Sequence, residues 1–212
     1  MAEGDLVIIT GLWDTYKSTT ALELGYALAT GKPWLRAFHV HKKGVVGVLQ
    51  AEINPGFYDD RLLAYPPADN LLICSDLSFD FDHLDDLREA IEVFNMDVLI
   101  LDPLGQMYPD KASNGEPFKE NEKAHVARLM KRLKLLPATV ILVHHDPKAS
   151  ASGLANWGSG SSSFMNDPDV RIHLERDYDK GTVQMQVRNR NQTPAHTFSA
   201  NYVDRRLIAR VS

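Results

Sequence analysis

The stretch of sequence that decides the fold reads Gly11-Leu12-Trp13-Asp14-Thr15-Tyr16-Lys17-Ser18-Thr19. It follows an apolar run, Leu6 to Ile9, that is typical of a buried strand, and a helical pattern starts directly after it. The stretch matches the phosphate-binding loop pattern G-x-x-x-x-G-K-[ST], except that Tyr16 replaces the second glycine. In such loops, backbone N–H groups and a helix N-terminus bind phosphate, while a lysine adds positive charge. We therefore predict a nucleoside polyphosphate site in this stretch.

The residues expected to contact the nucleotide come from the loop itself: Gly11, Asp14, Thr15, Tyr16, Lys17, Ser18 and Thr19. The expected cofactors are ATP and Mg²⁺, with the Ser18 hydroxyl as a ligand of the metal ion. Tyr16 leaves two alternatives open, because glycine at its position allows a free φ and close approach of the backbone. Either the tyrosine ring turns outward, or it crowds the nucleotide and weakens nucleotide binding.

The composition sets limits on the class of protein. The chain has 212 residues, 44% of them apolar, and we expect a single domain over residues 1–212. Its net charge of −5 excludes non-specific binding of nucleic acid by an overall basic surface. No signal peptide or membrane-spanning run is visible, so a cytoplasmic protein is expected. The single cysteine, Cys74, lies in an apolar run, where a small buried side chain is expected.

Apolar strand-like runs alternate with helical patterns through the first two thirds of the chain. The predicted strands are Leu6–Ile9, Val45–Ala51, Leu71–Cys74, Val98–Leu101 and Thr139–Val143. The predicted helices are Ser18–Thr30, Tyr58–Ala64, Leu84–Phe94 and Phe118–Leu136. Four later runs alternate and look like antiparallel strands: Val170–Leu174, Thr182–Val187, His196–Tyr202 and Arg205–Val211. The pattern predicts an α/β fold with a mostly parallel central sheet, helices on both faces, and antiparallel C-terminal strands that extend the sheet.

Two acidic residues follow buried strands and suit nucleotide chemistry. Asp102 ends the apolar run Val98–Leu101, which is the form of a Walker B element that holds Mg²⁺ directly or through water. Glu52 ends the run Val45–Ala51 in the same manner and is a candidate base for an attacking water. The alternatives are an ordinary turn-forming aspartate and a helix-capping or solvated glutamate.

His144-His145-Asp146 ends a further strand. Adjacent residues of a strand point to opposite faces, so we do not expect the two histidines to share a metal ion. We expect His145 to sense the terminal phosphate instead, with Lys148 beside it. The loop-like segments Pro103–Pro117 and Pro147–Ser163 follow strand ends at the expected ligand-binding edge of the sheet.

Taken in order, these motifs resemble those of the RecA-like P-loop ATPases of the plasmid RepA-type helicase group. The resemblance extends from Leu6 to Asn191 and includes Ala29-Thr30-Gly31-Lys32-Pro33-Trp34-Leu35, Asp60-Arg61-Leu62 and Gly158-Ser159-Gly160-Ser161-Ser162-Ser163. It implies Lys17 and Ser18 on the phosphates and Mg²⁺, Glu52 as the base, Asp102 on the metal and His145 as a sensor. It also implies that residues 149–163 face single-stranded DNA in a central channel.

The strand end Val187-Arg188-Asn189-Arg190-Asn191 resembles the Lys-x-Arg element of DnaB-type and RepA-type helicases, with Arg188 in place of the lysine. In those families the basic pair reaches into the neighbouring subunit's nucleotide site. The resemblance therefore implies that Arg188 and Arg190 act as an arginine finger within a homo-oligomer, expected to be a hexameric ring. The alternative is a solvated basic strand end.

The leading interpretation is an oligomeric ATPase, helicase or remodeller that acts on single-stranded DNA in plasmid- or phage-type replication. The alternative is a protein of the same fold that binds nucleotide as a regulatory or assembly module, with weak or no hydrolysis. A small-molecule kinase is disfavoured, because the sequence has no arginine-rich lid segment and its strand-end residues suit water activation.

Overall fold

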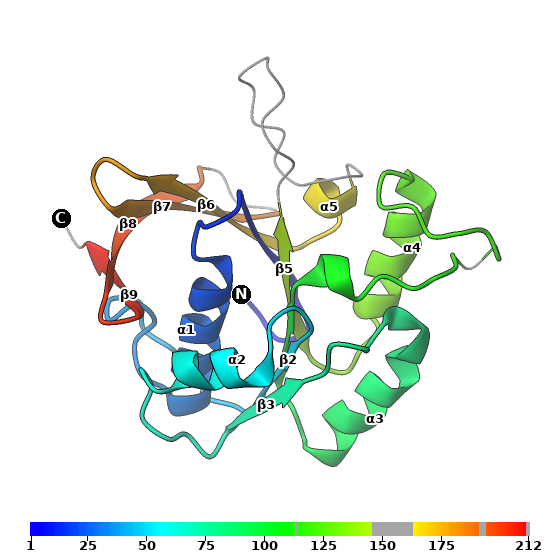
Figure 1. The fold of residues 1–212 in the computed structure, drawn as a ribbon, viewed down its shortest axis with the longest axis horizontal. Helices are drawn as coiled ribbons and strands as arrows, with labels where there is room; N and C mark the ends of the chain where they lie inside the picture. The colour runs from blue at the N-terminus through cyan, green and yellow to red at the C-terminus, as the bar shows by residue number, and fades with distance from the viewer. Residues whose placement is uncertain (113, 146–162, 191–193, 211–212) are drawn as a thin grey trace.

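A single nine-stranded sheet forms the centre of the fold. The computed structural model describes residues 1–112, 114–145, 163–190 and 194–210 (Figure 1). The strand order is β3-β2-β4-β5-β1-β6-β7-β8-β9. The bounds are β1 Leu6–Gly11, β2 Val46–Gln50, β3 Leu71–Ser75, β4 Val98–Asp102, β5 Thr139–His145, β6 Val170–Asp177, β7 Thr182–Asn189, β8 His196–Val203 and β9 Arg206–Arg210. Strands β1 to β6 pair in parallel, and β7, β8 and β9 continue the sheet antiparallel.

Helices cover both faces of the parallel part of the sheet. Their bounds are α1 Lys17–Thr30, α2 Pro55–Leu62, α3 Leu84–Val93, α4 Lys123–Leu133 and α5 Ser163–Asn166, with short 3₁₀ turns η1 Phe81–His83 and η2 Leu104–Gln106. One apolar core lies between the sheet and α3 and α4, and a second lies between the other face and α1. Figure 1 shows α1 on one side of the strands, with α3 and α4 on the other. The predicted fold class is confirmed.

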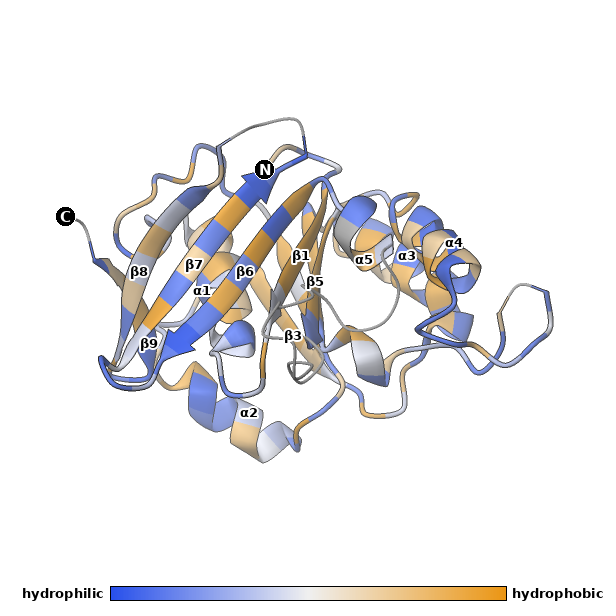
Figure 2. Cartoon of the chain, turned by 90° about the horizontal axis from the view of Figure 1, so that it is seen from above, coloured by the Kyte–Doolittle hydropathy of each residue, from blue (hydrophilic) through white to orange (hydrophobic). Residues whose placement is uncertain are grey.

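The hydropathy of the strands explains their positions in the sheet. All residues of β1, β2 and β4 are buried, as expected for parallel strands covered on both faces. Strands β6 and β7 alternate hydrophobic and hydrophilic residues (Figure 2), and their buried residues include Ile172, Leu174 and Met185. The alternation leaves one face of this part of the sheet polar, whereas the apolar residues of β1 and β5 form unbroken runs, Leu6–Ile9 and Val140–Val143.

Three details differ from the sequence-based expectations. β6 pairs in parallel with β1, so the antiparallel part begins at β7 rather than at β6. Helix α4 begins at Lys123 rather than at Phe118, because the Phe118 N–H bonds to the Asp110 carbonyl over 3.0 Å and the Phe118 ring stacks on Tyr108. Cys74 is exposed rather than buried, and its strand β3 lies at the edge of the sheet.

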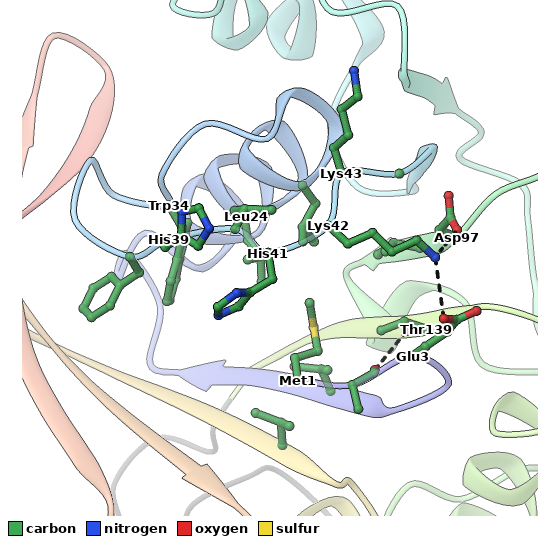
Figure 3. Close-up of a pocket in the computed structure, with 18 of the residues that line it drawn as sticks. Met1, Glu3, Leu24, Trp34, His39, His41, Lys42, Lys43, Asp97 and Thr139 are labelled. Carbon is green, nitrogen blue, oxygen red and sulfur yellow. Dashed lines mark hydrogen bonds and ion pairs between the residues drawn. The ribbon is translucent and has the colours of Figure 1, made fainter.

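A pocket of about 430 Å³ lies at the amino-terminal edge of the parallel strands (Figure 3). Its apolar wall includes Val7 and Leu24, and its rim carries His39, His41 and Lys42. This edge is opposite the one that carries the phosphate-binding loop. None of the helices within the described ranges combines the length and apolar character that crossing a membrane requires.

Candidate nucleotide-binding site

The phosphate-binding loop leaves the sheet at Gly11 and enters α1 at Lys17. A Cβ atom at Gly11 would lie 2.6 Å from both the Leu174 carbonyl oxygen and the Thr15 hydroxyl, so the close packing of the loop against β6 requires glycine. The Thr15 hydroxyl donates to the Leu12 carbonyl over 2.8 Å and closes the loop on itself. The loop therefore holds its curved shape through its own contacts.

The N-terminus of α1 is suited to an anion. Its first turn, Lys17–Thr20, contains no acidic residue, and among the described residues no side chain caps this helix end. The helix dipole and the N–H groups of this turn consequently favour negative charge from a ligand. The Lys17 ammonium is buried and donates to the Leu12 carbonyl over 2.6 Å, which holds it inside the loop. A bound phosphate would meet both the helix end and this ammonium.

Ser18 and Asp102 bring two oxygen ligands together. The Ser18 hydroxyl donates to Oδ1 of Asp102 over 3.1 Å, and the aspartate is only 5% exposed. Burial raises the pKa of Asp102 to about 6, although the Ser18 hydrogen bond and the charges of Arg61 and Lys17 lower it. Mg²⁺ prefers a hydroxyl and a carboxylate in this arrangement, and it would supply the positive charge that a buried carboxylate lacks. The donor set therefore fits a magnesium ion.

Glu52 lies two residues after Gln50, the last residue of β2. Gln50 is in register with Asp102 at the end of the neighbouring strand β4, so Glu52 and Asp102 lie at the same edge of the sheet. The buried Gln50 side chain shapes the turn by accepting from the N–H groups of Glu52 and Ile53 over 2.9 and 2.8 Å. Asn54, not Glu52, caps helix α2. The Glu52 carboxylate is exposed and lines the nucleotide pocket, where a water molecule can reach it.

His145 ends β5 in register with Gly11 on β1. Its ring stacks on Trp13 at 4.6 Å between centroids, and both ring nitrogens are buried with no hydrogen-bond partner among the described residues. Burial, followed by the charge of Lys17, lowers the pKa of His145 to about 4, so the ring is neutral at pH 7. His144 instead packs against Phe164, 4.3 Å between ring centroids. The described residues contain no cluster of three His, Cys, Asp or Glu side chains suited to a metal ion.

These groups share one pocket of about 510 Å³. It is lined by Trp13, Asp14, Thr15, Tyr16, Lys17, Ser18, Thr19, Leu22, Glu52, Ile53, Asp60, Arg61, Tyr65, His145, Tyr202 and Arg205. The carboxyl ends of β1, β2 and β5 thus place the predicted loop, Glu52 and His145 around one space, and Asp102 joins it through Ser18.

Sequence reasoning missed several residues that line this pocket or support it. Trp13 occupies a position of the loop pattern that any residue can take, and Tyr202 comes from β8, far from the loop in sequence. Arg176 of β6 donates to the Asp14 carbonyl over 3.2 Å and pairs with the Asp14 carboxylate. A local pattern cannot reveal such contacts. Asp60 and Arg61, by contrast, belong to a run that carried the family resemblance.

Tyr16 has the backbone conformation of the glycine that it replaces, and its side chain lines the nucleotide pocket. Its backbone has a φ of 63°, the left-handed conformation that glycine ordinarily supplies, and Asp14 also has a positive φ of 58°. The tyrosine ring stacks on Tyr202, 4.5 Å between centroids, and both residues line the pocket. The Arg176 guanidinium lies 4.7 Å from the centroid of the same ring. These contacts stabilise a backbone conformation that costs about 1 kcal/mol or more for a residue other than glycine.

The structure does not bring Arg188 and Arg190 to the pocket of their own chain. β7 runs antiparallel to β6, so its carboxyl end lies beside Val170, which is in register with Val7 near the start of β1. Both arginines are exposed, and Arg190 lies 3.7 Å from Asp169. Most of the predicted DNA-facing segment, residues 149–162, and the neighbouring Asp146 and Lys148 lie outside the described residues.

Comparison with known families agrees with this geometry. A family model described as an AAA domain matches residues 1–151, which include the loop, Glu52, Asp102 and His145. The chain belongs to this AAA domain family. No curated protein matches its sequence.

Among solved structures, the fold is similar to that of a KaiC-like protein from the hyperthermophilic archaeon Pyrococcus horikoshii. The TM-score is 0.63 at 14% sequence identity, and the alignment covers 100% of this chain and 91% of that one. At this identity the likeness shows the fold alone, an α/β fold of the RecA-like type with a mostly parallel central sheet and antiparallel C-terminal strands. The narrower resemblance to RepA-type and DnaB-type helicases stays a prediction.

Proposed function

We propose that the protein binds ATP with Mg²⁺ and hydrolyses it. The observation that carries this proposal is the 3.1 Å contact between the Ser18 hydroxyl and the buried Asp102 carboxylate, at the mouth of a loop that also holds Lys17. The Ser18 hydroxyl, the Asp102 carboxylate and the Lys17 ammonium lie at the N-terminus of α1. The first turn of this helix contains no acidic residue. This combination suits a polyphosphate with a divalent cation and few other ligands.

Each residue has a role that follows from its position. Lys17 and the N–H groups of α1 orient the phosphates, and Ser18 and Asp102 hold the metal ion, which when bound neutralises charge on the phosphate oxygens. Glu52 accepts a proton from water as the water oxygen bonds to the γ-phosphorus and the bond to the leaving ADP oxygen breaks. His145 is neutral, its ring nitrogens have no hydrogen-bond partner among the described residues, and it donates a hydrogen bond to the terminal phosphate or to the product phosphate.

Hydrolysis at full rate requires a second copy of the chain under this proposal. Arg188 and Arg190 lie at the opposite edge of the sheet from their own loop, so they can stabilise charge only in a neighbour's site. The exposure of both side chains supports this role. A homo-oligomer, with a hexameric ring as the expected form, would bring each pair to the next pocket.

The finer proposal is a helicase or translocase acting on single-stranded DNA. It rests on the family resemblance alone, since the segment proposed to face the DNA lies outside the described residues. The alternative, a nucleotide-binding regulatory or assembly module, is favoured if the positive-φ Tyr16 makes the loop a slow catalyst. Stimulation of hydrolysis by single-stranded DNA distinguishes the two.

The experiment that tests the proposal compares ATP hydrolysis by the wild type and by Glu52→Gln, with and without Mg²⁺ and single-stranded DNA. Loss of a general base costs on the order of 100-fold to 10,000-fold in turnover, while ATP binding should persist. Glu89→Gln, an exposed glutamate on α3, is the matched control and should leave the rate unchanged. Wild-type protein that binds ATP but never hydrolyses it, alone or with DNA, would support the module instead.

A further inference from the structure

The side chain of Tyr16 stacks with those of Tyr202 and Arg176 at the side of the nucleotide pocket. Its ring lies 4.5 Å from that of Tyr202 at an interplanar angle of 20°. The Arg176 guanidinium lies 4.7 Å from the same ring centroid and 4.7 Å from that of Tyr178. One ring face accommodates one stacked group at such a distance, so Arg176 and Tyr202 lie on opposite faces of Tyr16. The tyrosine ring therefore fills a slot between two flat walls.

The walls of this slot have independent supports. Arg176 comes from β6 and is fixed by its bonds to the carbonyl and carboxylate of Asp14. Tyr202 comes from β8, and the residue is 41% exposed. Neither wall belongs to the loop, so removing the Tyr16 ring would leave both in place with a flat space between them. A planar ring of another molecule would fit that space through aromatic stacking and a cation–π contact.

The slot and the reacting groups come from different elements of the fold. Glu52, His145 and Lys17 gather at the sheet edge, whereas Tyr202 and Arg205 line the pocket from the C-terminal hairpin. A nucleotide whose terminal phosphate lies near Glu52 extends its ribose and base away from that edge. Tyr16 directly precedes Lys17 in the loop, and its ring occupies the space where flat walls are available for a base.

We propose that Tyr16 is an internal competitor of the nucleobase: its ring occupies a base-binding slot between Arg176 and Tyr202 and must leave it for a nucleotide to bind fully. This inference rests on the proposed function, because it concerns the same site. It assigns a specificity-determining role to the residue that departs from the loop pattern. A polyphosphate without a base does not need the slot, so its binding is independent of the tyrosine ring.

The two ligands make the proposal testable by calorimetry with ATP and inorganic tripolyphosphate, each with Mg²⁺. Tyr16→Gly removes the ring and suits the φ of 63°, so the loop backbone is kept. We expect it to tighten ATP binding by about tenfold, the scale of one stacking and one cation–π contact, and to leave tripolyphosphate binding within about twofold. Tyr16→Gly combined with Tyr202→Ala should lose the gain for ATP, because one wall of the slot is gone. Unfolding midpoints of all variants verify that each is folded.

Three results would overturn the proposal. Equal changes for ATP and tripolyphosphate in Tyr16→Gly would show that the residue acts on the loop backbone and not on a base. Weaker ATP binding by Tyr16→Gly would mean that the ring supports the nucleotide instead of competing with it. Binding of neither ligand by either protein would remove the proposed function, and this inference with it.

Discussion

The Ser18 hydroxyl donates a hydrogen bond to the Asp102 carboxylate over 3.1 Å, although the two residues are 84 positions apart in the sequence. The first opens helix α1 and the second ends strand β4, which is separated from β1 by β5. The contact therefore ties the loop to the carboxyl edge of the sheet. The two oxygens stand where a magnesium ion would replace the proton between them.

Replacing either member of this pair should abolish hydrolysis that depends on magnesium. Ser18→Ala and Asp102→Asn each remove one proposed ligand, and metal catalysis contributes several kcal/mol, so we expect a loss of roughly 100-fold or more. Rates measured across a Mg²⁺ titration check this. Wild-type rates at saturating Mg²⁺ in both variants would contradict the assignment.

Substitution of Gly11 should destabilise the fold, because a new Cβ would meet the backbone oxygen of Leu174 at 2.6 Å. Gly11→Ala is expected to lower the free energy of unfolding by about 1–3 kcal/mol, and to weaken ATP binding. Gly105→Ala is the matched control, since a Cβ there meets nothing within 4 Å. Urea denaturation of the two variants side by side makes the comparison, and equal stabilities would contradict the packing argument.

The ion pair between Glu23 and Arg206 should be essential for anchoring α1 to the C-terminal hairpin. Two hydrogen bonds of 2.8 Å join them, with Glu23 2% and Arg206 20% exposed. Arg206→Ala leaves a buried carboxylate without its partner and should cost about 3 kcal/mol of unfolding free energy. Arg210→Ala, an exposed arginine of the same strand, should cost little.

The double variant Glu23→Gln with Arg206→Ala separates charge from packing. Because it removes the buried charge as well, it should be more stable than Arg206→Ala alone. Thermal unfolding measures the difference. A double variant as unstable as the single one would mean that lost contacts of Arg206 with Tyr26 and Tyr65, not the stranded charge, cause the destabilisation.

His145 should make the folded state sensitive to acid. Its pKa falls from an ordinary value of 6.5 to about 4 on folding, so between these values the unfolded chain binds more protons. Its contribution to stability is present above pH 6.5 and is lost as the pH falls towards 4. The unfolding free energy of His145→Asn should therefore fall less steeply over this range than that of the wild type. The raised pKa of Asp102 makes stability fall as the pH rises, and this effect is the same in the wild type and in the variant. Identical slopes of unfolding free energy against pH in the two proteins would contradict the burial of His145.

The central part of the site could be predicted from the sequence, because each of its residues follows a buried strand. Apolar runs fix where strands end, and parallel strands bring their carboxyl ends to one edge. That argument predicts that Ser18, Glu52, Asp102 and His145 lie around one space, which the structure shows. The fold class followed from the same alternation of strands and helices.

The surroundings of Tyr16 could not be predicted, because they depend on tertiary pairing. Arg176 and Tyr202 reach the loop only because β6 pairs with β1 and the antiparallel hairpins follow it. The exposure of Cys74 and the late start of α4 have the same origin. An apolar run does not reveal that its strand is at an edge, and a helical pattern at Phe118 does not show that its ring is held by Tyr108.

A crystal structure of the protein with Mg²⁺ and a non-hydrolysable ATP analogue would test the magnesium site of Ser18 and Asp102 without any assay of activity. We expect the phosphates within residues 11–18 and a magnesium ion about 2.0–2.1 Å from the Ser18 hydroxyl, with Asp102 bound to it directly or through water. An analogue bound elsewhere, or phosphates in the loop with no metal ion beside Ser18 and Asp102, would contradict this assignment.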